Sequence, residues 1–442
     1  MWRGFLFSGF LGCVDLSGED GSSEAELESS DRGRENTASD SNSSEGMARD
    51  IISAVAASAS TSFAVFLTGA LAVQMRATLH FGPDALGLSI SIYYIGAAAG
   101  SVPFGRLAEA VGGIRIMKPT VVIAGGLLAI IALSVHSWLG LSIVLFFAGL
   151  VSSAMQPATN LFLARRIPRN RQGFAFGIKQ AAIPFAALFG GLAVPGIALT
   201  IGWRWAFVAA AAWAVLTGVA IPRSPSTLAA YRARHRDPVP KDNIGPLIVL
   251  GIGFGLGIFA AAAMTGFLVI SAVDGGLSRS NAGYIAGIAG LIAVVARIYA
   301  GIAADRRGSG HFKVVAAMLV IGCLGYGALA IGSASRIAIF FWIGAFIAFG
   351  AGWGWNGLFN YAVIQTHQRS PARATAITQV GGRLASVFGP LVFGLLVSDV
   401  SYSFAWMVNG VVTLVGAAII IWGRHMLLGS GENVTAANPQ IL

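Results

Sequence analysis

The 442-residue chain is too apolar for a protein whose whole surface faces water. Apolar residues make up 55% of it and charged residues only 11%, whereas a soluble domain carries about 25% charged residues. The net charge of +10 is a pattern seen in nucleic-acid-binding proteins. Here, however, the basic residues lie between apolar runs of roughly 20 residues, the length of a helix that spans a bilayer. The composition therefore excludes a soluble protein and predicts a lipid bilayer, not nucleic acid, as the partner.

The N-terminal residues differ in composition from the rest. The stretch from Asp15 to Asp50 is rich in Ser, Glu and Asp and has few side chains to bury. We therefore predict that residues 1–50 form a disordered tail. Residues 1–14 resemble a short signal peptide without a cleavage site. We interpret the tail as a dispensable extension, with translation starting at Met47.

Twelve apolar segments follow in chain order, and each must be helical because lipid offers backbone groups no other partners. The longest polar connection, residues 223–243, divides them six and six. The predicted fold class is an all-α membrane protein with an N-terminal six-helix bundle (51–222), a cytoplasmic linker (223–243), a C-terminal bundle (244–426) and a tail (427–442). The predicted spans are 52–75, 84–107, 117–135, 139–163, 173–197, 203–222, 245–270, 281–304, 313–334, 337–364, 372–397 and 402–423.

The distribution of basic residues predicts the orientation of these spans. Connections on one side, such as 165–171 and 306–313, hold most of the arginine and lysine. Short loops rich in basic residues stay in the cytoplasm, so we expect this side and both termini to be cytoplasmic. The opposite connections hold only Arg76, Arg204, Arg279 and Arg336.

The two halves align residue by residue. GRLAEAVG at 105–112 matches GIAADRRG at 301–308, an offset of 301 − 105 = 196. Nearly constant offsets indicate a duplicated six-helix unit with a substrate cleft between the halves. Further matches are Gln180, Phe189 and Gly190 with Gln379, Phe388 and Gly389 (offset 199), and Gln156 and Asn160 with Asn356 and Asn360 (offset 200).

The repeated loop resembles the G-x-L-a-D-R-x-G motif of the major facilitator superfamily of secondary transporters, and the resemblance covers nearly all of residues 50–425. In that family a charge network at this loop stabilises one state of the gate. The resemblance implies gating roles for Asp305, Arg306 and Glu109, with Gly301 and Gly105 packing closely. The alternative is that these charges only set the topology. Glu109 departs from the motif, which has Asp there.

Two segments resemble particular branches of the superfamily. Residues 173–191 and 202–207 are similar to bacterial cyanate and nitroimidazole carriers, which implies the bacterial inner membrane. ARIYAG at 296–301 resembles the eighth span of monocarboxylate and oxalate carriers, where an arginine four residues before the glycine binds a carboxylate. By this resemblance Arg297 is an anion-binding residue. The aspartate that often accompanies it in those carriers is missing here.

Three cations fall inside predicted spans, namely Lys179, Arg297 and Arg383. A charge at mid-membrane costs roughly 2.5–3.5 kcal/mol and therefore needs a partner or a wet cavity. Arg383 lies near the middle of its span with Gln379 one turn before it, and we predict that it lines the central cavity. The alternatives are an inter-helix hydrogen bond for Arg383 and, for Arg297 and Lys179, side chains that reach the membrane interface.

Carboxylates and histidines fall outside the predicted spans, so the membrane interior carries a positive field that an anionic substrate would neutralise. The tenth span adds aromatic and amide side chains able to bind a solute; alternatively, its amides only bridge helices. Tyr93, Tyr94 and Gln156 are weaker candidates of the same kind. The predicted substrate-binding residues are Arg383, Arg297, Gln379, Asn356, Asn360, Lys179, Gln180 and Tyr361.

These features predict a monomeric secondary transporter that moves a small organic anion, such as a carboxylate, by alternating access. The alternative is a proton-driven drug or metabolite efflux transporter, which usually needs an acidic residue in the first, fourth or seventh span. The sequence contains no nucleophile motif, metal cluster or phosphate-binding loop, so we expect no enzyme activity and no cofactor or metal.

Overall fold

The computed structural model describes residues 23–168, 172–221, 244–307, 310–367 and 371–429. Within these ranges all regular secondary structure is helical, and eleven helices are long and apolar enough to cross a membrane. The predicted linker 223–243 lies outside the described ranges. The chain divides into two units, residues 1–49 and 50–442, and the packing described below belongs to the second.

The first half of the chain supplies six of the spanning helices. Its fifth span is divided between α6, α7 and a short π-helix, η2. The elements are α1 (Ser23–Ala70), α2 (Ala72–Leu79), α3 (Pro83–Val111), α4 (Gly113–Ser134), α5 (Trp138–Arg166), α6 (Gln172–Gln180), α7 (Ala182–Ala193), η2 (Val194–Ala198) and α8 (Trp203–Ala220).

The second half repeats this order, except that its tenth span is built from two shorter helices, α12 and α13. The elements are α9 (Gly245–Asp274), α10 (Arg279–Arg307), α11 (His311–Ser335), α12 (Ala338–Gly350), α13 (Asn356–Thr366), α14 (Pro371–Asp399) and α15 (Tyr402–Gly429). The predicted class, an all-α membrane protein with twelve spans in two six-helix halves, is confirmed.

The beginning of α1 differs from the sequence prediction. Residues 1–50 were expected to be disordered, yet α1 is helical from Ser23. A helix already nucleated by an apolar span extends at little cost, since each further residue adds one hydrogen bond without a new nucleus. The stretch of α1 before Met47 contains Glu, Ala and Arg, which are compatible with that extension.

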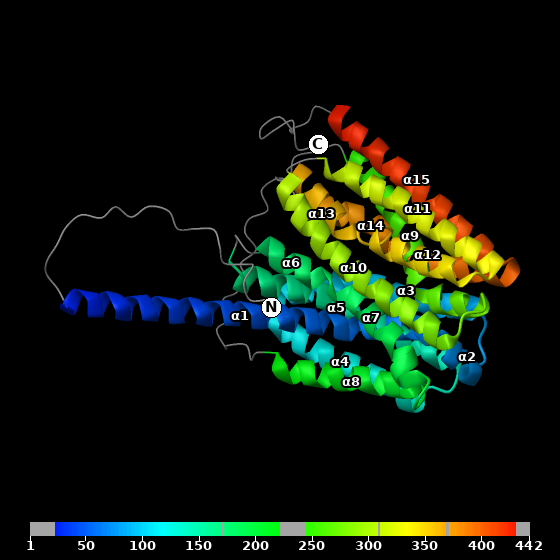
Figure 1. Cartoon of the computed structure of the whole chain (residues 1–442), viewed down its shortest axis with the longest axis horizontal. Coiled ribbons are helices and arrows are strands. Elements are labelled where there is room, and N and C mark those ends of the chain that lie inside the picture. Colours follow the sequence, from blue (N-terminus) through cyan, green and yellow to red (C-terminus); the bar gives the residue numbers. More distant parts are fainter. Residues whose placement is uncertain (1–22, 169–171, 222–243, 308–309, 368–370, 430–442) are drawn as a thin grey trace. The chain divides into compact units, whose positions relative to one another are not determined.

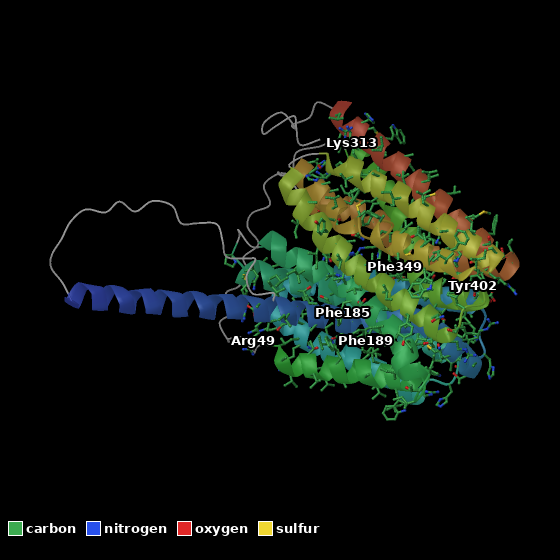
Figure 2. The ribbon with its side chains drawn as sticks, in the orientation of Figure 1. Arg49, Phe185, Phe189, Lys313, Phe349 and Tyr402 are labelled. Atoms are coloured by element: carbon green, nitrogen blue, oxygen red, sulfur yellow. The ribbon has the colours of Figure 1, made fainter. Side chains whose placement is uncertain are left out.

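The buried aromatic and aliphatic side chains form one cluster that contains residues of both halves and a second cluster within the second half. Figure 1 shows the helices that contribute to them. In the first half α3 lies against α5 and α4 against α8, and the rings of Phe63 and Phe189 are 4.9 Å apart. In the second half α9 packs against α14 and α15, and the rings of Phe254 and Phe359 are 4.7 Å apart. Figure 2 shows Phe185 and Phe189 among the first-half helices, and Lys313 and Tyr402 towards opposite ends of the second-half helices.

We call the end of the bundle where α3 ends and α11 begins the basic end, and the other end the opposite end. The two halves meet through α3 with α14 and through α7 with α10. These contacts are made by glycines near the opposite end, where a Cβ on Gly87 would collide with Pro390, and one on Gly191 with Gly287. Small residues allow such close backbone approach between spanning helices.

The tenth span is interrupted at a glycine-rich segment, residues 350–354. The N–H groups of Ala351 and Gly352 both donate to the Ile347 carbonyl, at 2.9 and 3.2 Å, so the regular helical ladder ends there. The buried Trp355 indole Nε1 donates to the Gly352 carbonyl at 2.7 Å. A side chain thus replaces the backbone partner that the break removes.

The glycine contacts between the halves predict a difference between two Gly→Ala variants. Gly191→Ala should lower the melting temperature, since overpacking a tight contact costs about 1–3 kcal/mol. Gly126, which has no atom within 4 Å of a Cβ position, is the matched control. Gly126→Ala should leave stability unchanged or raise it by up to about 1 kcal/mol. Equal thermal unfolding of both variants in detergent would contradict this interpretation.

The interruption of the tenth span predicts a specific cost for losing the Trp355 hydrogen bond. Trp355→Phe should destabilise the protein by about 1–3 kcal/mol, because the Gly352 carbonyl is left without a partner in a buried site. Trp422, which is 59% exposed, is the control, and Trp422→Phe should have little effect. Chemical unfolding in mixed micelles measures both, and similar losses would show that the bond contributes nothing.

Candidate functional site

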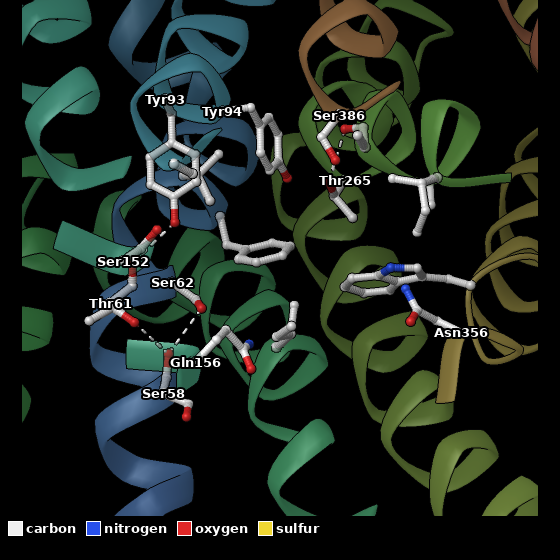
Figure 3. Close-up of a pocket in the computed structure, with 18 of the residues that line it drawn as sticks. Ser58, Thr61, Ser62, Tyr93, Tyr94, Ser152, Gln156, Thr265, Asn356 and Ser386 are labelled. Carbon is white, nitrogen blue, oxygen red and sulfur yellow. Dashed lines mark hydrogen bonds between the residues drawn. The ribbon is translucent and has the colours of Figure 1, made fainter. Parts of the chain in front are cut away.

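A cavity of about 240 Å³ lies between the two halves, lined by helices from both (Figure 3). The first half contributes α1, α3, α5 and α7, and the second contributes α9, α10, α13, α14 and the interruption between α12 and α13. The lining residues are Ser58, Thr61, Ser62, Val65, Phe66, Tyr93, Tyr94, Ala97, Ser152, Met155, Gln156, Ile183, Ile258, Ala261, Ala262, Thr265, Arg297, Trp353, Asn356 and Ser386.

The polar part of this lining consists mainly of hydroxyl groups. Serine, threonine and tyrosine side chains come from α1, α3, α5, α9 and α14. Several already have partners: Ser62 donates to the Ser58 carbonyl at 3.0 Å, and Tyr93 to the Thr61 carbonyl at 3.3 Å. Gln156 and Asn356 add an amide from each half, and Figure 3 shows them on different helices around the space.

Arg297 is the one charged residue among the residues that line the cavity, and it is 8% exposed. Its Nη1 donates to the backbone carbonyl of Gln180 at 2.8 Å. That carbonyl lacks its helical partner because the residue four positions on is Pro184, which has no N–H. A proline in the first half thus provides the acceptor that holds an arginine of the second.

Two further features define the surroundings of the Arg297 guanidinium. Its Cζ lies 4.7 Å from the centre of the Trp353 ring, a cation–π contact. Its Nε is buried without a hydrogen-bond partner. The guanidinium is therefore fixed on one side by a carbonyl and on one face by an indole. A planar guanidinium at a cavity wall is suited to an anion such as a carboxylate.

A buried polar chain connects α6 to α5 in the first half. Lys179 is 2% exposed, and its Nζ donates to the side-chain oxygens of Gln156 and, at 2.9 Å, Asn160. Gln156 lines the cavity whereas Lys179 does not. The ammonium therefore lies behind the cavity wall, one amide group away from the lining.

The second half contains the equivalent chain with a neutral donor. Gln379 Nε2 donates to Asn360 Oδ1 at 2.8 Å, and Asn360 Nδ2 donates to Asn356 Oδ1 at 3.2 Å. Donor and acceptor are 19 residues apart here, as Lys179 and Asn160 are in the first half. Judged by these hydrogen bonds, Lys179 of the first half is equivalent to Gln379 of the second, 200 residues later in the chain. The sequence alignment had paired Gln379 with Gln180.

The predicted substrate-binding residues separate into two groups. Arg297 and Asn356 line the cavity; Arg383, Gln379, Asn360, Lys179, Gln180 and Tyr361 do not. Arg383 was predicted to line it, but it lies one turn from the lining residue Ser386 towards the basic end, where it is exposed. Most of the others have neighbouring partners: Lys179, Gln379 and Asn360 form hydrogen bonds with side chains of adjacent helices, and the Tyr361 ring lies 5.1 Å from that of His311.

The predicted gating residues lie near the basic end. The side chains of Asp305 and Arg306 are outside the described residues. Within the described part, Glu109 is exposed and forms no ion pair. Gly105 and Gly301 were expected to pack closely, but no atom lies within 4 Å of a Cβ position at either glycine. Gly112 of the same loop has a φ of +93°, which favours glycine.

Sequence reasoning missed an ion pair near the basic end and most of the cavity hydroxyls. Asp50 was assigned to the disordered tail, yet it is 8% exposed and its Oδ1 lies 3.1 Å from Arg166 Nη1. Its position immediately before an apolar span was an available signal. Ser58 and Ser62 are one turn apart on α1, so a polar face on an apolar helix could have identified them.

Comparisons with known proteins agree with this architecture. A sequence profile of the Major Facilitator Superfamily matches residues 52–369. Two Agrobacterium vitis proteins, each named "Putative tartrate transporter", are 23% and 24% identical to this chain over 289 and 281 residues. Each match covers 57% of this chain but only 62% and 65% of those relatives. The chain therefore spans less than two thirds of their length.

An uncharacterised transporter of the same superfamily from Mycobacterium tuberculosis is 25% identical over 299 residues, covering 65% of this chain and 66% of the relative. Among solved structures, a bacterial homolog of the human lysosomal transporter Spinster, inward-facing and occupied, has a TM-score of 0.67 at 15% identity. It covers 86% of this chain and 97% of its own.

A D-xylose–proton symporter has a TM-score of 0.65 at 17% identity, covering 84% of this chain and 96% of its own. Both structural similarities concern the fold alone. The repeated six-helix halves and the cavity between them agree with the profile match. Because that match covers more than half of the chain, the chain belongs to the major facilitator superfamily.

Proposed function

We propose that the protein is a secondary transporter that moves a small organic carboxylate across the membrane by alternating access. The observation that carries this proposal is the position of Arg297. It is the one charged residue in the cavity lining, and its Nε lacks a partner. A bound carboxylate would neutralise the guanidinium and accept hydrogen bonds from it.

The electrostatics of the cavity favour an anion over a cation. The lining residues include an arginine but no aspartate or glutamate. A buried positive charge in a medium of low polarity attracts an anion strongly and raises the energy of a cation placed beside it. A cationic drug, the substrate of the alternative efflux transporter, would therefore bind poorly here.

The rest of the lining suits a small polar solute. A volume of about 240 Å³ lies below the range of about 300–1,000 Å³ typical of drug-sized ligands. Hydroxyl groups and the amides of Gln156 and Asn356 can bind further oxygen atoms of the solute. The Agrobacterium relatives named for tartrate support a polar carboxylate. The similarity to cyanate and nitroimidazole carriers stays a prediction.

The arrangement of the halves supports alternating access with the cavity accessible from the basic end. Close contacts join the halves near the opposite end, whereas Gly105 and Gly301 lie beside open space. If basic loops are cytoplasmic, this is an inward-facing state. Arg383, exposed one turn from Ser386, would then meet an incoming anion first. Asp305, Arg306 and Glu109 would act when the basic end closes.

The proposal predicts that anion binding depends on Arg297. Tartrate, malate, succinate or lactate should raise the melting temperature of the purified wild type, whereas choline and ethidium should not. Arg297→Gln should weaken carboxylate binding at least about tenfold, because a hydrogen bond to a charged group contributes about 1.5–3 kcal/mol. Arg297→Lys should recover part of the affinity, since it keeps the charge but loses the planar fork.

The matched control for this prediction is Arg279→Gln. Arg279 lies on the same helix but is exposed at its other end, so its loss should leave carboxylate binding unchanged. Counterflow of labelled carboxylate into proteoliposomes should be highest for the wild type and Arg279→Gln, lower for Arg297→Lys and lowest for Arg297→Gln. Stabilisation by the cations alone, or carboxylate binding that survives in Arg297→Gln, would reject the proposed site.

A further inference from the structure

A buried lysine lies beside the cavity without an ionic partner among the described residues. Lys179 is 2% exposed, and its Nζ donates to the amide oxygens of Gln156 and Asn160. Both acceptors are uncharged. Neutral amides do not compensate the charge of an ammonium group, so a charged Lys179 inside the membrane would cost roughly 2.5–3.5 kcal/mol.

The second half shows that bridging these helices does not require a charge. Gln379 occupies the equivalent position and makes the equivalent contact with Asn360 at 2.8 Å. A neutral glutamine thus holds α14 against α13 as Lys179 holds α6 against α5. Since an amide suffices for bridging, the ammonium must serve another purpose or be a cost without compensation.

The groups that face Lys179 come from the three helices packed against α6, namely α5, α7 and α10. From α5 they are Gln156 and Asn160, and α7 has no titratable residue. From α10 the nearest charge is Arg297, which binds the carbonyl of Gln180, the residue next to Lys179. The other titratable residues of α5 and α10 are Arg165, Arg166, Arg279, Tyr284, Tyr299 and three whose side chains are not described, Asp305, Arg306 and Arg307.

This arrangement couples the charge of Lys179 to the occupancy of the cavity. When the cavity is empty, Arg297 is already positive, and a second buried cation nearby is disfavoured by repulsion and by loss of hydration. A carboxylate bound beside Arg297 and Gln156 would instead favour the charged form of Lys179. Its negative charge would stabilise the ammonium, from which it is separated only by the Gln156 amide. Anion binding and proton binding would therefore favour each other.

We propose that Lys179 binds the proton that travels with the anion. In the proposed cycle, which rests on the proposed function, the neutral amine of Lys179 takes up one proton as a carboxylate enters the cavity. It releases that proton to the side on which the carboxylate leaves. The proton cancels one negative charge of the substrate, and a pH gradient can then drive accumulation.

Proton uptake on binding tests this proposal directly. Tartrate, malate, succinate and lactate, each adjusted to pH 8, are added to weakly buffered wild-type protein containing a pH-indicator dye. We expect uptake of up to about one proton per carboxylate bound, and tighter binding as the pH falls. Lys179→Gln, which copies Gln379 of the second half, should bind carboxylate without taking up a proton.

Two further variants complete the experiment. Lys313→Gln removes an exposed lysine and should keep the proton uptake of the wild type. Lys179→Met tests the same loss of charge with an apolar side chain, in case the glutamine variant does not fold. In proteoliposomes an inward proton gradient should drive accumulation by the wild type, whereas Lys179→Gln should still exchange labelled carboxylate but ignore the gradient.

The outcomes separate this proposal from the proposed function. If the wild type binds carboxylate through Arg297 but takes up no proton, or if Lys179→Gln retains the uptake, Lys179 is not the coupling residue and the anion site stands. If the wild type neither binds nor exchanges any of the four carboxylates, the proposed function fails and this proposal fails with it.

Discussion

The structure depends on the rule that a polar backbone group inside a membrane must find a partner within the protein. Among the sequence features that release carbonyls from their helices are Pro184 in the fifth span and the glycine-rich segment in the tenth. Each carbonyl is taken by a side-chain N–H, from Arg297 at Gln180 and from Trp355 at Gly352. These two interruptions lie at the cavity, and the side chains that repair them help to shape it.

The same rule explains how one duplicated sequence produces two different halves. An asparagine links neighbouring helices in both halves, Asn160 between α5 and α6 and Asn360 between α13 and α14. The donor is a lysine in one and a glutamine in the other. Because Lys179 is buried beside the cavity, exchanging an amide for a lysine at this position changes the electrostatics of the cavity without changing the bridge. The duplication therefore keeps the geometry and lets the charge diverge.

The fold could be predicted from the sequence because bilayer thickness and the duplicated motif act on long segments. The cavity could be predicted only in part. Arg297 and Asn356 were identified, since a charge and an amide in a span are rare enough to be informative. Arg383 is not among the lining residues of the cavity. Span boundaries predicted from the sequence are uncertain by several residues, so they determine neither the depth of a side chain nor its direction around the helix. The hydrogen-bond partners of Lys179 and Gln379 could not be predicted from the sequence, because they depend on how neighbouring helices pack.

The hydrogen bond between Arg297 and Gln180 has a consequence for movement. It joins α10 of the second half to α6 of the first, so any rocking of the halves must preserve, break or replace it. Breaking it in an empty cavity would leave a buried carbonyl and a buried guanidinium both short of partners, which costs several kcal/mol at such sites. A carboxylate can satisfy the guanidinium, although the carbonyl would still need another donor. Occupancy of the cavity therefore lowers the cost of separating the halves at this point. In the proposed transport cycle this dependence would be an advantage, because an empty transporter that resists movement is less prone to dissipate the gradient that drives it.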